Sequence, residues 1–402
     1  MRIFLLFHDA ALPHSRYLLE GFAAHDEVSK LTVAYPKGRG EDLIFSVGSG
    51  FEADKVYPYQ MVGLSSSLLR PKWIRWPSLL SAMRAAKPDY VIVLDEAMSP
   101  NAFLAGLAVR WLGINAPVVF YGFENISQRP PWGWLREKGL TALLPFLRKM
   151  LRYVLFDRLL QPLRKKLIIG GLVSYTECAK VIEENGWMPI LREQWWGVNT
   201  KLFERAAQKQ SGTARPYPDA WKIQSNQVVL GYVGRFVPEK GVLDLLQAIK
   251  ELGNAYVLVC IGGGPQEDEI IQHAEELGVK DQLRLLPPIS SSALAEHVAA
   301  MDVLALPSHT DVFWKEQYGR VLVEAMATGV PVVGSRSGAI PEVIGDSRRT
   351  FDEGSISQIC LAIKAAESMT IEERKDLQKR AQKGDLSVFV QAYIDLYHQV
   401  RD

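Results

Sequence analysis

The chain has 402 residues, enough for two or three domains with buried cores. Its 48% of hydrophobic and 23% of charged residues are typical of soluble globular proteins and exclude the disordered, collagenous and coiled-coil classes. The formal net charge is only +1, so nothing indicates a nucleic-acid partner.

Short apolar runs alternate with helical patterns through the first half of the chain. Five of these runs are predicted strands: 3–7, 31–35, 90–94, 118–121 and 172–175. Strands separated by helices are typical of a parallel sheet in an α/β domain. The first half of the chain is therefore predicted to form one Rossmann-like domain.

The segment 132–167 differs from its surroundings in charge. It carries nine lysines and arginines against two acidic residues, a net charge of +7, with leucines between them and Trp132 and Trp134 in front. A basic amphipathic helix of this kind is typical of a segment that lies on an anionic membrane surface. A pair of helices packed on the sheet, with solvated basic side chains, explains the same pattern. Both interpretations stay open.

The strand and helix rhythm stops at 210–227, where Ser, Gly, Thr, Pro and Asn dominate, and a linker is predicted there. It then resumes in a second α/β domain. The expected strands are 228–233, 256–261, 283–285, 303–306 and 332–334, and helical patterns cover 238–252 and 266–277.

A helix ended by Gly329 and followed by a strand is predicted within 316–334. If that helix includes Glu316 and Glu324, eight residues apart, both lie on one face about 12 Å from each other. Its first amides would be near Gly319, Arg320 and Val321, where the helix dipole favours an anion. A nucleoside diphosphate would suit that end of the helix.

Two cations, Arg235 and Lys240, follow the first strand of the second domain beside a glycine turn. An arginine fork and a lysine point charge suit a pyrophosphate. The Gly-Gly-Gly-Pro turn at 262–265 is neither a P-loop nor a complete dinucleotide fingerprint, so NAD(P) is not predicted.

Taken together, these motifs resemble the retaining glycosyltransferases of family 4, which have the GT-B fold. The resemblance rests on Gly-Arg-x4-Lys-Gly at 234–241, Gly-Gly-Gly-Pro at 262–265, Glu-x7-Glu at 316–324 and Gly-Ala-Ile-Pro-Glu at 338–342, and more weakly on 197–203 and the tail. It implies two Rossmann-like domains whose parallel sheets face across a cleft. The implied parts are an acceptor-binding domain at 1–209, a linker at 210–227, a nucleotide-sugar-binding domain at 228–385 and a closing helix at 386–402 that returns to the first domain.

The resemblance also implies roles for individual residues. Arg235 and Lys240 hold the donor diphosphate, Glu324 accepts hydrogen bonds from the ribose, and catalytic Glu316 touches the transferred sugar. The remaining donor contacts come from the amides of Gly319, Arg320 and Val321 and from the chain at Gly263 and Ile289. No metal and no cofactor is expected, because fixed cations and dipoles stabilise the leaving diphosphate, and the chain has no Asp-x-Asp motif.

The first domain departs from the family pattern. No glycine occurs at 8–16, and the histidine that relatives carry after the strand at 118–121 is missing. Glu124 or Asn125 is expected to take its place, and Asp95 is a second catalytic candidate at the carboxyl edge of the sheet, beside Glu96. For Asp95 the alternative of a helix cap ahead of Pro100 stays open.

These observations predict a hexosyltransferase that builds a glycolipid or a surface polysaccharide from a nucleoside diphosphate sugar and a glycan or lipid-linked acceptor. Three isolated cysteines fit a reducing compartment, and no run is long enough to span a bilayer. We therefore expect a cytoplasmic protein, either free or at the inner face of the membrane through 132–167. Two alternatives stay open: a non-catalytic, membrane-associated nucleotide-sugar-binding protein, and a UDP-sugar epimerase.

Overall fold

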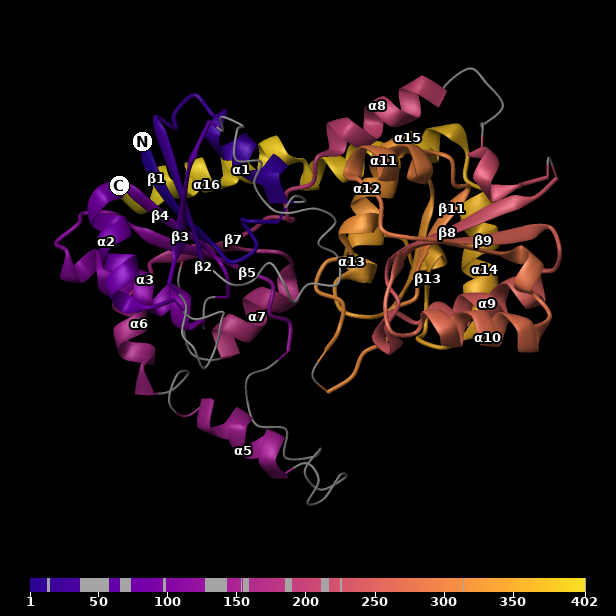
Figure 1. Cartoon of the computed structure of the whole chain (residues 1–402), viewed down its shortest axis with the longest axis horizontal. Coiled ribbons are helices and arrows are strands. Elements are labelled where there is room, and N and C mark those ends of the chain that lie inside the picture. The colour runs from indigo at the N-terminus through magenta and orange to yellow at the C-terminus, as the bar shows by residue number, and fades with distance from the viewer. Residues whose placement is uncertain are drawn as a thin grey trace. The chain divides into compact units, whose positions relative to one another are not determined.

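The computed structural model describes residues 1–12, 15–36, 58–65, 74–96, 99–126, 143–152, 154, 159–184, 190–210, 217–224, 226–312 and 314–401. They form two compact units (Figure 1). The first unit comprises Met1–Trp195 together with Phe389–Asp402, and the second comprises Trp196–Val388. Each unit is built on one parallel sheet, so the prediction of two Rossmann-like halves is confirmed.

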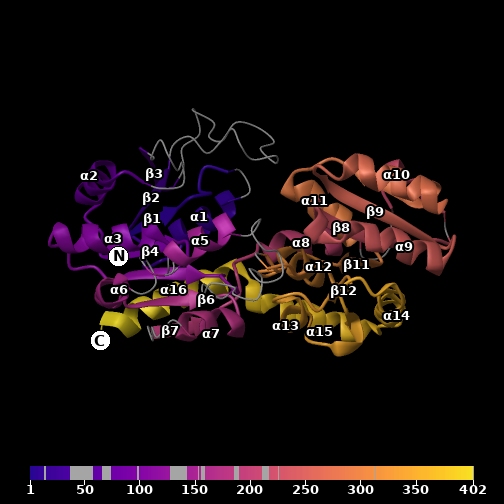
Figure 2. The same cartoon turned by 90° about the horizontal axis from the view of Figure 1, so that it is seen from below.

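The first unit has a seven-stranded sheet in the order β3-β2-β1-β4-β5-β6-β7, which Figure 2 shows from β3 down to β7. β1, β4 and β5 lie at its centre, and almost every residue in them is buried, because both faces of a parallel sheet are covered. The strands are β1 (Arg2–Phe7), β2 (Lys30–Pro36), β3 (Gln60–Leu64), β4 (Tyr90–Leu94), β5 (Val118–Gly122), β6 (Gly170–Val173) and β7 (Ile190–Glu193). The described helices are α1 (Arg16–Ala23), α2 (Trp76–Ala86), α3 (Pro100–Trp111), α5 (Leu143–Arg152), α6 (Gln161–Leu167), α7 (Thr176–Glu184) and most of α16 (Leu386–Arg401).

The C-terminal helix α16 completes the core of the first unit. Phe389, Tyr393 and Tyr397 recur every four residues and therefore share one face of the helix. The Tyr393 hydroxyl donates to the Phe120 carbonyl at 3.2 Å, and the Tyr90 hydroxyl donates to the Tyr393 carbonyl at 3.1 Å. The last turns of the chain are thus fastened to β4 and β5.

The second unit has a six-stranded sheet in the order β10-β9-β8-β11-β12-β13. Helices α9, α10 and α14 cover one side of it, and α8, α11 and α12 lie on the other (Figure 1). The strands are β8 (Val228–Arg235), β9 (Tyr256–Gly263), β10 (Leu283–Leu286), β11 (Val303–Leu306), β12 (Val332–Ser335) and β13 (Thr350–Phe351). The helices are α8 (Thr200–Gln210), α9 (Val242–Leu252), α10 (Glu267–Leu277), α11 (Ser291–Ala299), α12 (Arg320–Thr328), α13 (Ile340–Ile344), α14 (Ile356–Glu367) and α15 (Ile371–Ala381). Short 3₁₀ turns occur at η4 (Asp219–Trp221), η5 (Pro238–Lys240), η6 (Lys280–Gln282), η7 (Ser347–Arg349) and η8 (Gln382–Gly384).

The boundary between the units differs from the expected one. The chain leaves the first unit after Trp195, and α8 packs on α11 and α12 of the second unit, so the first domain does not extend to 209. The described part of the expected linker 210–227 also belongs to the second unit. Trp221 is fully buried there, and its carbonyl accepts from Arg284 Nε at 2.6 Å. The linker was predicted from the polar composition of the segment, in which Trp221 is the one large buried anchor among the described residues. Residues 211–216 and 225 lie outside the described residues.

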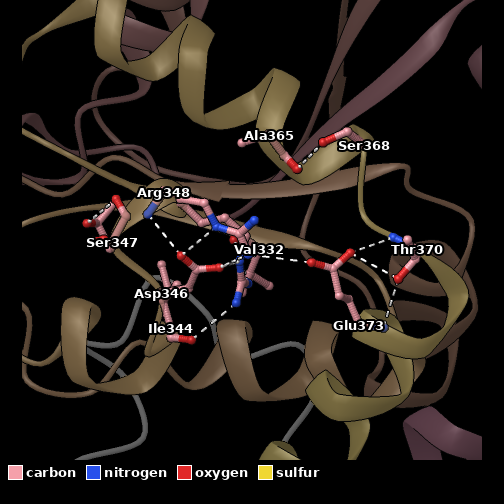
Figure 3. A network of polar contacts seen from close by, with 11 residues as sticks. Val332, Ile344, Asp346, Ser347, Arg348, Ala365, Ser368, Thr370 and Glu373 are labelled. Carbon is pink, nitrogen blue, oxygen red and sulfur yellow. Dashed lines mark hydrogen bonds and ion pairs between the residues drawn. The ribbon is translucent and has the colours of Figure 1, made fainter.

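Polar contacts fasten the outer end of the second sheet (Figure 3). The Asp346 carboxylate accepts from the guanidinium groups of Arg348 at 2.8 Å and Arg349 at 3.4 Å. Buried Arg349 also donates to the Val332 carbonyl at 3.3 Å and the Ile344 carbonyl at 3.4 Å. The network therefore joins β12, the end of α13 and the turn η7.

Candidate functional site

The expected donor-binding residues lie at the carboxyl edge of the second sheet. Arg235 ends β8, Gly263 ends β9, and Ile289 follows β10. An added Cβ on Gly263 would lie 3.8 Å from Pro288 Cδ, so the ends of β9 and β10 approach each other. β8 and β11 are neighbours although β9 and β10 separate them in the chain, and such a switch point is where open α/β sheets bind ligands.

Glu316 and Glu324 do not share a helix face, and that prediction is wrong. α12 begins only at Arg320, while Glu316 lies in the preceding loop. The reason is Gly319, the residue before the helix, whose φ of 75° is in the left-handed region. An added Cβ there would also lie 2.9 Å from Leu306 Cδ2. Gly319 thus separates the loop that carries Glu316 from the helix that carries Glu324.

The buried Glu316 carboxylate is the centre of the site. Its Oε2 accepts from Lys240 Nζ at 2.6 Å and from Ser308 Oγ at 2.8 Å. Its main-chain N donates to Ser337 Oγ at 3.3 Å. The Lys240 ammonium also lies 4.6 Å from the centre of the Trp314 ring, within cation–π distance. Groups that follow β8 and β11 therefore converge on the Glu316 carboxylate, and a group that follows β12 holds its main chain.

The start of α12 adds a positive helix end to this site. Arg320 and Val321 carry the first two amides of the helix, as predicted. The binding of an anion there stays a prediction. Glu324 lies one turn further on and is 7% exposed. Burial raises the pKa of this carboxyl, and Arg320, whose Nε lies 3.1 Å from Glu324 Oε1, opposes the rise.

Arg235 is the most accessible cation of the site, with a side chain that is 50% exposed. Its guanidinium lies 3.6 Å from the Glu239 carboxylate, and its carbonyl accepts from the Tyr232 hydroxyl at 2.7 Å. An added Cβ on Gly262 would lie 1.9 Å from the Gly234 carbonyl oxygen, so only glycine allows β8 and β9 to end this close together. The ends of β8 and β9 are therefore held side by side by glycine.

The candidates in the first unit gather at the carboxyl edge of its own sheet. Asp95 follows β4, and its carboxylate accepts from Asn101 Nδ2 at 3.1 Å and from the Glu96 amide at 2.9 Å. It does not cap the next helix, because Ser99 does so by accepting from the Ala102 amide at 3.0 Å. The alternative interpretation of Asp95 as a cap is therefore wrong.

Glu96 and Glu124 lie close enough to affect each other. Glu96 Oε1 accepts from the Phe123 amide at 3.1 Å and so joins the ends of β4 and β5. Burial, and then the Glu124 and Asp95 carboxylates, raise the pKa of Glu96 well above its ordinary value. Asn125 is buried and donates to the Tyr175 hydroxyl, which makes Glu124 the more accessible residue of the two considered for this position.

The basic segment 132–167 is described only in part, because 132–142, 153 and 155–158 lie outside the described residues. Its described part contains two helices, α5 and α6. Arg164 is fully buried and so does not belong to a solvated or membrane-facing basic surface. The large apolar side chains exposed on this part are Leu143, Leu144, Leu147, Leu151, Val154, Leu159 and Leu163. None of the helices that the structure describes is long and apolar enough to cross a membrane.

Sequence reasoning missed several residues around Glu316. The sequence predicts no role for Ser308 or for Ser337. His309 and Asp244, whose side chains meet at 2.6 Å, are 65 residues apart in the chain. Their only sequence signal is position, since His309 comes soon after one strand and Asp244 lies at the start of the helix after another.

Comparison with known proteins finds a family similar to most of the second unit. Residues 215–384 match the family "Glycosyl transferases group 1". The D-inositol 3-phosphate glycosyltransferase of Mycolicibacterium smegmatis is 36% identical over 130 residues, which are 31% of this chain and 28% of that protein. The enzyme of the same name from Actinosynnema mirum is 33% identical over 161 residues, 35% of this chain and 37% of that protein. The matched stretch thus spans about a third of the length of these relatives.

Solved structures match the chain over almost its whole length. HepE of Anabaena in complex with UDP aligns with a TM-score of 0.67 at 15% identity, covering 99% of this chain and 100% of that one. WaaG, a glycosyltransferase involved in lipopolysaccharide biosynthesis, aligns with a TM-score of 0.63 at 14% identity, covering 98% and 99%. At these identities the likeness establishes the fold. Residues 215–384 are thus similar to the glycosyl transferases group 1, and the whole chain has the GT-B fold.

Proposed function

We propose that this protein is a retaining, metal-independent hexosyltransferase. It moves a sugar from a nucleoside diphosphate sugar to a glycan or lipid-linked acceptor. The observation that carries the proposal is the meeting of Lys240 and Ser308 on Glu316, beside the start of α12, inside a region that matches a glycosyltransferase family. Cations, a helix N-terminus and a buried carboxylate together suit a ligand with a diphosphate at one end and hydroxyl groups at the other.

The donor is held by residues of the second unit. Arg235 and Lys240 bind the diphosphate, and the first amides of α12 bind its oxygens. Glu324 accepts from the ribose hydroxyls and Glu316 from hydroxyls of the transferred sugar, while the chain near Gly263 and Ile289 contacts the base. The UDP in the HepE structure makes UDP-sugars the first donors to test.

The proposed reaction exchanges one bond at the anomeric carbon. The bond from this carbon to the phosphate oxygen breaks, and a new bond to the acceptor hydroxyl oxygen forms on the same face. The hydroxyl proton passes to an oxygen of the leaving diphosphate. Lys240, Arg235 and the helix end stabilise the negative charge that develops there, which is the task that a metal ion performs in other transferases. For this to happen Lys240 exchanges the Glu316 carboxylate for a phosphate oxygen.

The acceptor binds to the first unit, where Glu124 and Asp95 are the catalytic candidates. Their position at the carboxyl ends of β4 and β5 is the place where a parallel sheet presents functional groups. Neither residue belongs to the donor-binding unit. Glu124→Gln and Asp95→Asn should therefore abolish transfer while donor binding is unchanged.

The test is a screen of UDP-, GDP- and ADP-sugars by thermal shift and donor hydrolysis in the presence of EDTA. A ligand at 100 times its Kd stabilises the folded state by about 2.7 kcal/mol, which raises the Tm. One class of sugar nucleotide should stabilise the chain, and Lys240→Ala and Glu324→Ala should lose the effect. Lys250→Ala, at an exposed position of α9, is the matched control.

Each outcome of the screen has a distinct meaning. If no sugar nucleotide shifts the Tm, the proposed donor site is wrong. Binding without donor hydrolysis or transfer would favour a non-catalytic nucleotide-sugar-binding protein. Conversion of a UDP-sugar into its epimer without transfer would favour an epimerase. A product whose anomeric configuration is inverted would contradict the retaining mechanism.

The lipid-linked acceptor and the membrane contact rest on the exposed leucines of the described part of 132–167 and on Lys165 and Lys166, which are exposed beside them. Apolar and basic side chains side by side suit an anionic lipid surface. The protein should float with phosphatidylglycerol vesicles but not with phosphatidylcholine vesicles. Lys165→Glu combined with Lys166→Glu should reduce flotation, whereas the same reversal at exposed Lys250 and Lys375 should not; equal flotation of both variants would contradict the membrane contact.

A further inference from the structure

A histidine and an aspartate outside the proposed donor contacts form a pair beside Lys240. His309 follows Ser308 in the loop after β11, and its Nε2 lies 2.6 Å from Asp244 Oδ2 in the first turn of α9. The same residue is fixed through its main chain, since the His309 amide donates to the Glu239 carbonyl at 2.9 Å. Two bonds of one residue thus tie the loop after β11 to the segment that carries Lys240.

The two segments approach closely because Gly241 lies between them. An added Cβ on Gly241 would lie 2.1 Å from the Pro307 carbonyl oxygen and 2.7 Å from His309 Cδ2. The imidazole ring therefore packs on the turn that directly follows Lys240. The side chains of two successive residues thus contact different partners: Ser308 donates to Glu316, and His309 bonds to Asp244.

We propose that His309, bonded to Asp244, is a positioning residue of the donor site: it fixes the loop after β11 against the start of α9, so that Ser308 and Lys240 meet on Glu316. This inference rests on the proposed function, because it assigns His309 a part in holding the donor-binding groups. In this proposal His309 acts through Ser308 and Lys240 and does not contact the donor itself.

The strength of this link depends on the protonation of His309. The charged groups that face the imidazole are Asp244 from α9 and Glu353 from the turn after β13. Asp244 raises the pKa of His309 above its ordinary value, burial opposes the rise, and Glu353 adds to it. The imidazolium forms an ion pair as well as a hydrogen bond with the Asp244 carboxylate, whereas the neutral ring keeps only the hydrogen bond. The link should therefore weaken as the pH rises through the pKa of His309.

The test measures donor affinity against pH by calorimetry. The probe is UDP-glucose, or GDP-mannose or ADP-glucose if the screen above selects another base. The diphosphate of a sugar nucleotide is a diester and keeps its charge through this pH range, so the probe itself adds no inflection. The affinity of the unchanged protein should fall by about fivefold across the titration of His309, which corresponds to the loss of about 1 kcal/mol.

Two variants test whether the change of affinity with pH comes from His309 and its bond to Asp244. His309→Gln should remove the inflection and hold the affinity at its high-pH value. Asp244→Asn should keep a hydrogen bond but lower the pKa of His309, so the inflection should move to lower pH. His273→Gln is the matched control, because His273 lies on α10 beside Glu276 and should leave the profile unchanged.

The outcomes separate this inference from the proposed function. If Lys240→Ala binds the donor like the unchanged protein, the proposed function fails. If Lys240→Ala loses the donor but His309→Gln and Asp244→Asn keep the original profile, only the role of His309 fails. Should His309→Gln fold poorly, the position of the inflection in Asp244→Asn, checked by the NMR titration of the His309 ring protons, decides the matter.

Discussion

At the scale of single residues, the candidate donor site neutralises its own cations. Lys240 is paired with Glu316, Arg320 with Glu324 and Arg235 with Glu239. A diphosphate that binds here competes with a carboxylate for each of these positive charges. The three pairs differ in burial, since both partners are largely buried only in the pair of Lys240 and Glu316. The exposed pair of Arg235 and Glu239 is therefore the easiest to perturb without unfolding the unit.

Glu239→Gln should raise the affinity for the sugar nucleotide. The change removes the carboxylate that lies 3.6 Å from Arg235 and leaves this guanidinium to the phosphate. Exposed pairs are worth up to about 1 kcal/mol, so an increase of about two- to fivefold is expected. Calorimetry at low salt measures it, and the gain should shrink at high salt because ions screen the pair. An unchanged affinity would show that Glu239 does not compete with the donor.

Gly241→Ala should destabilise the second unit. Its φ of 65° is in the left-handed region, and an added Cβ would meet the Pro307 carbonyl oxygen. The conformation alone costs about 1–2 kcal/mol for a residue with a side chain, and the steric overlap adds to it. Gly278→Ala is the control: its φ is 74°, but an added Cβ would have no described heavy atom within 4 Å. Calorimetry should show a clearly larger loss of Tm for Gly241→Ala, and equal losses would contradict the close approach.

At the scale of elements, the central strands could be predicted, whereas of the four edge strands only β10 was predicted. β4 and β11 have the predicted bounds, because both are continuous apolar runs. β3 and β7 are the two edge strands of the first sheet, and they were missed because each is incompletely buried and lacks a continuous apolar run. β6 lies two residues before the predicted strand, because it begins with Gly170 and Gly171, which do not register as an apolar run.

The polar network around Asp346 should stabilise the outer end of the second sheet in a pH-dependent way. Its arginine partners hold the pKa of Asp346 at about 2, below the ordinary value of 3.8. The stabilisation is therefore fully present above pH 3.8 and is lost as the pH falls through about 2. Asp346→Asn should lower the free energy of unfolding at neutral pH by about 1–2 kcal/mol, the lower figure reflecting the exposure of Arg348.

Thermal unfolding of Asp346→Asn at several pH values measures this effect. The difference in Tm from the unchanged protein should be largest near pH 7 and should disappear in strong acid. Asp376→Asn is the control, because Asp376 forms only an exposed pair with Lys379 on α15 and should change the Tm little. A Tm loss as small as that of the control would show that the contacts of Arg349 with Val332 and Ile344 suffice without Asp346.

At the scale of the whole molecule, the two Rossmann-like halves could be predicted because the strand rhythm stops and resumes. The residues of the candidate donor site could also be selected from the sequence, since their glycines and charges lie in short motifs of one unit. Two features could not be predicted from the sequence. The role of Trp221 depends on packing with distant residues such as His297, and the meeting of Glu96 with Phe123 depends on the order of the strands. Contacts between residues far apart in the chain leave no pattern in the neighbouring sequence from which they could be predicted.

The course of the C-terminal helix has a consequence for how the protein forms on the ribosome. The second unit is one continuous stretch, Trp196–Val388, whereas the first needs Phe389–Asp402, which are synthesised only after the whole second unit. Domains usually fold in the order of synthesis, starting from the N-terminus. Here the order is reversed, because the second unit can finish while the first still lacks Phe389 and Tyr393 in its core.

Separate expression of the two pieces tests this order. The fragment 196–388 should fold alone, whereas 1–195 should be loosely packed and prone to aggregate until 389–402 is supplied as a peptide or through a short linker. Circular dichroism and calorimetry would distinguish these states, and a cooperative melt of 1–195 alone would contradict the expectation. During translation, the nascent N-terminal half would then need protection, as by a chaperone, until α16 has been synthesised.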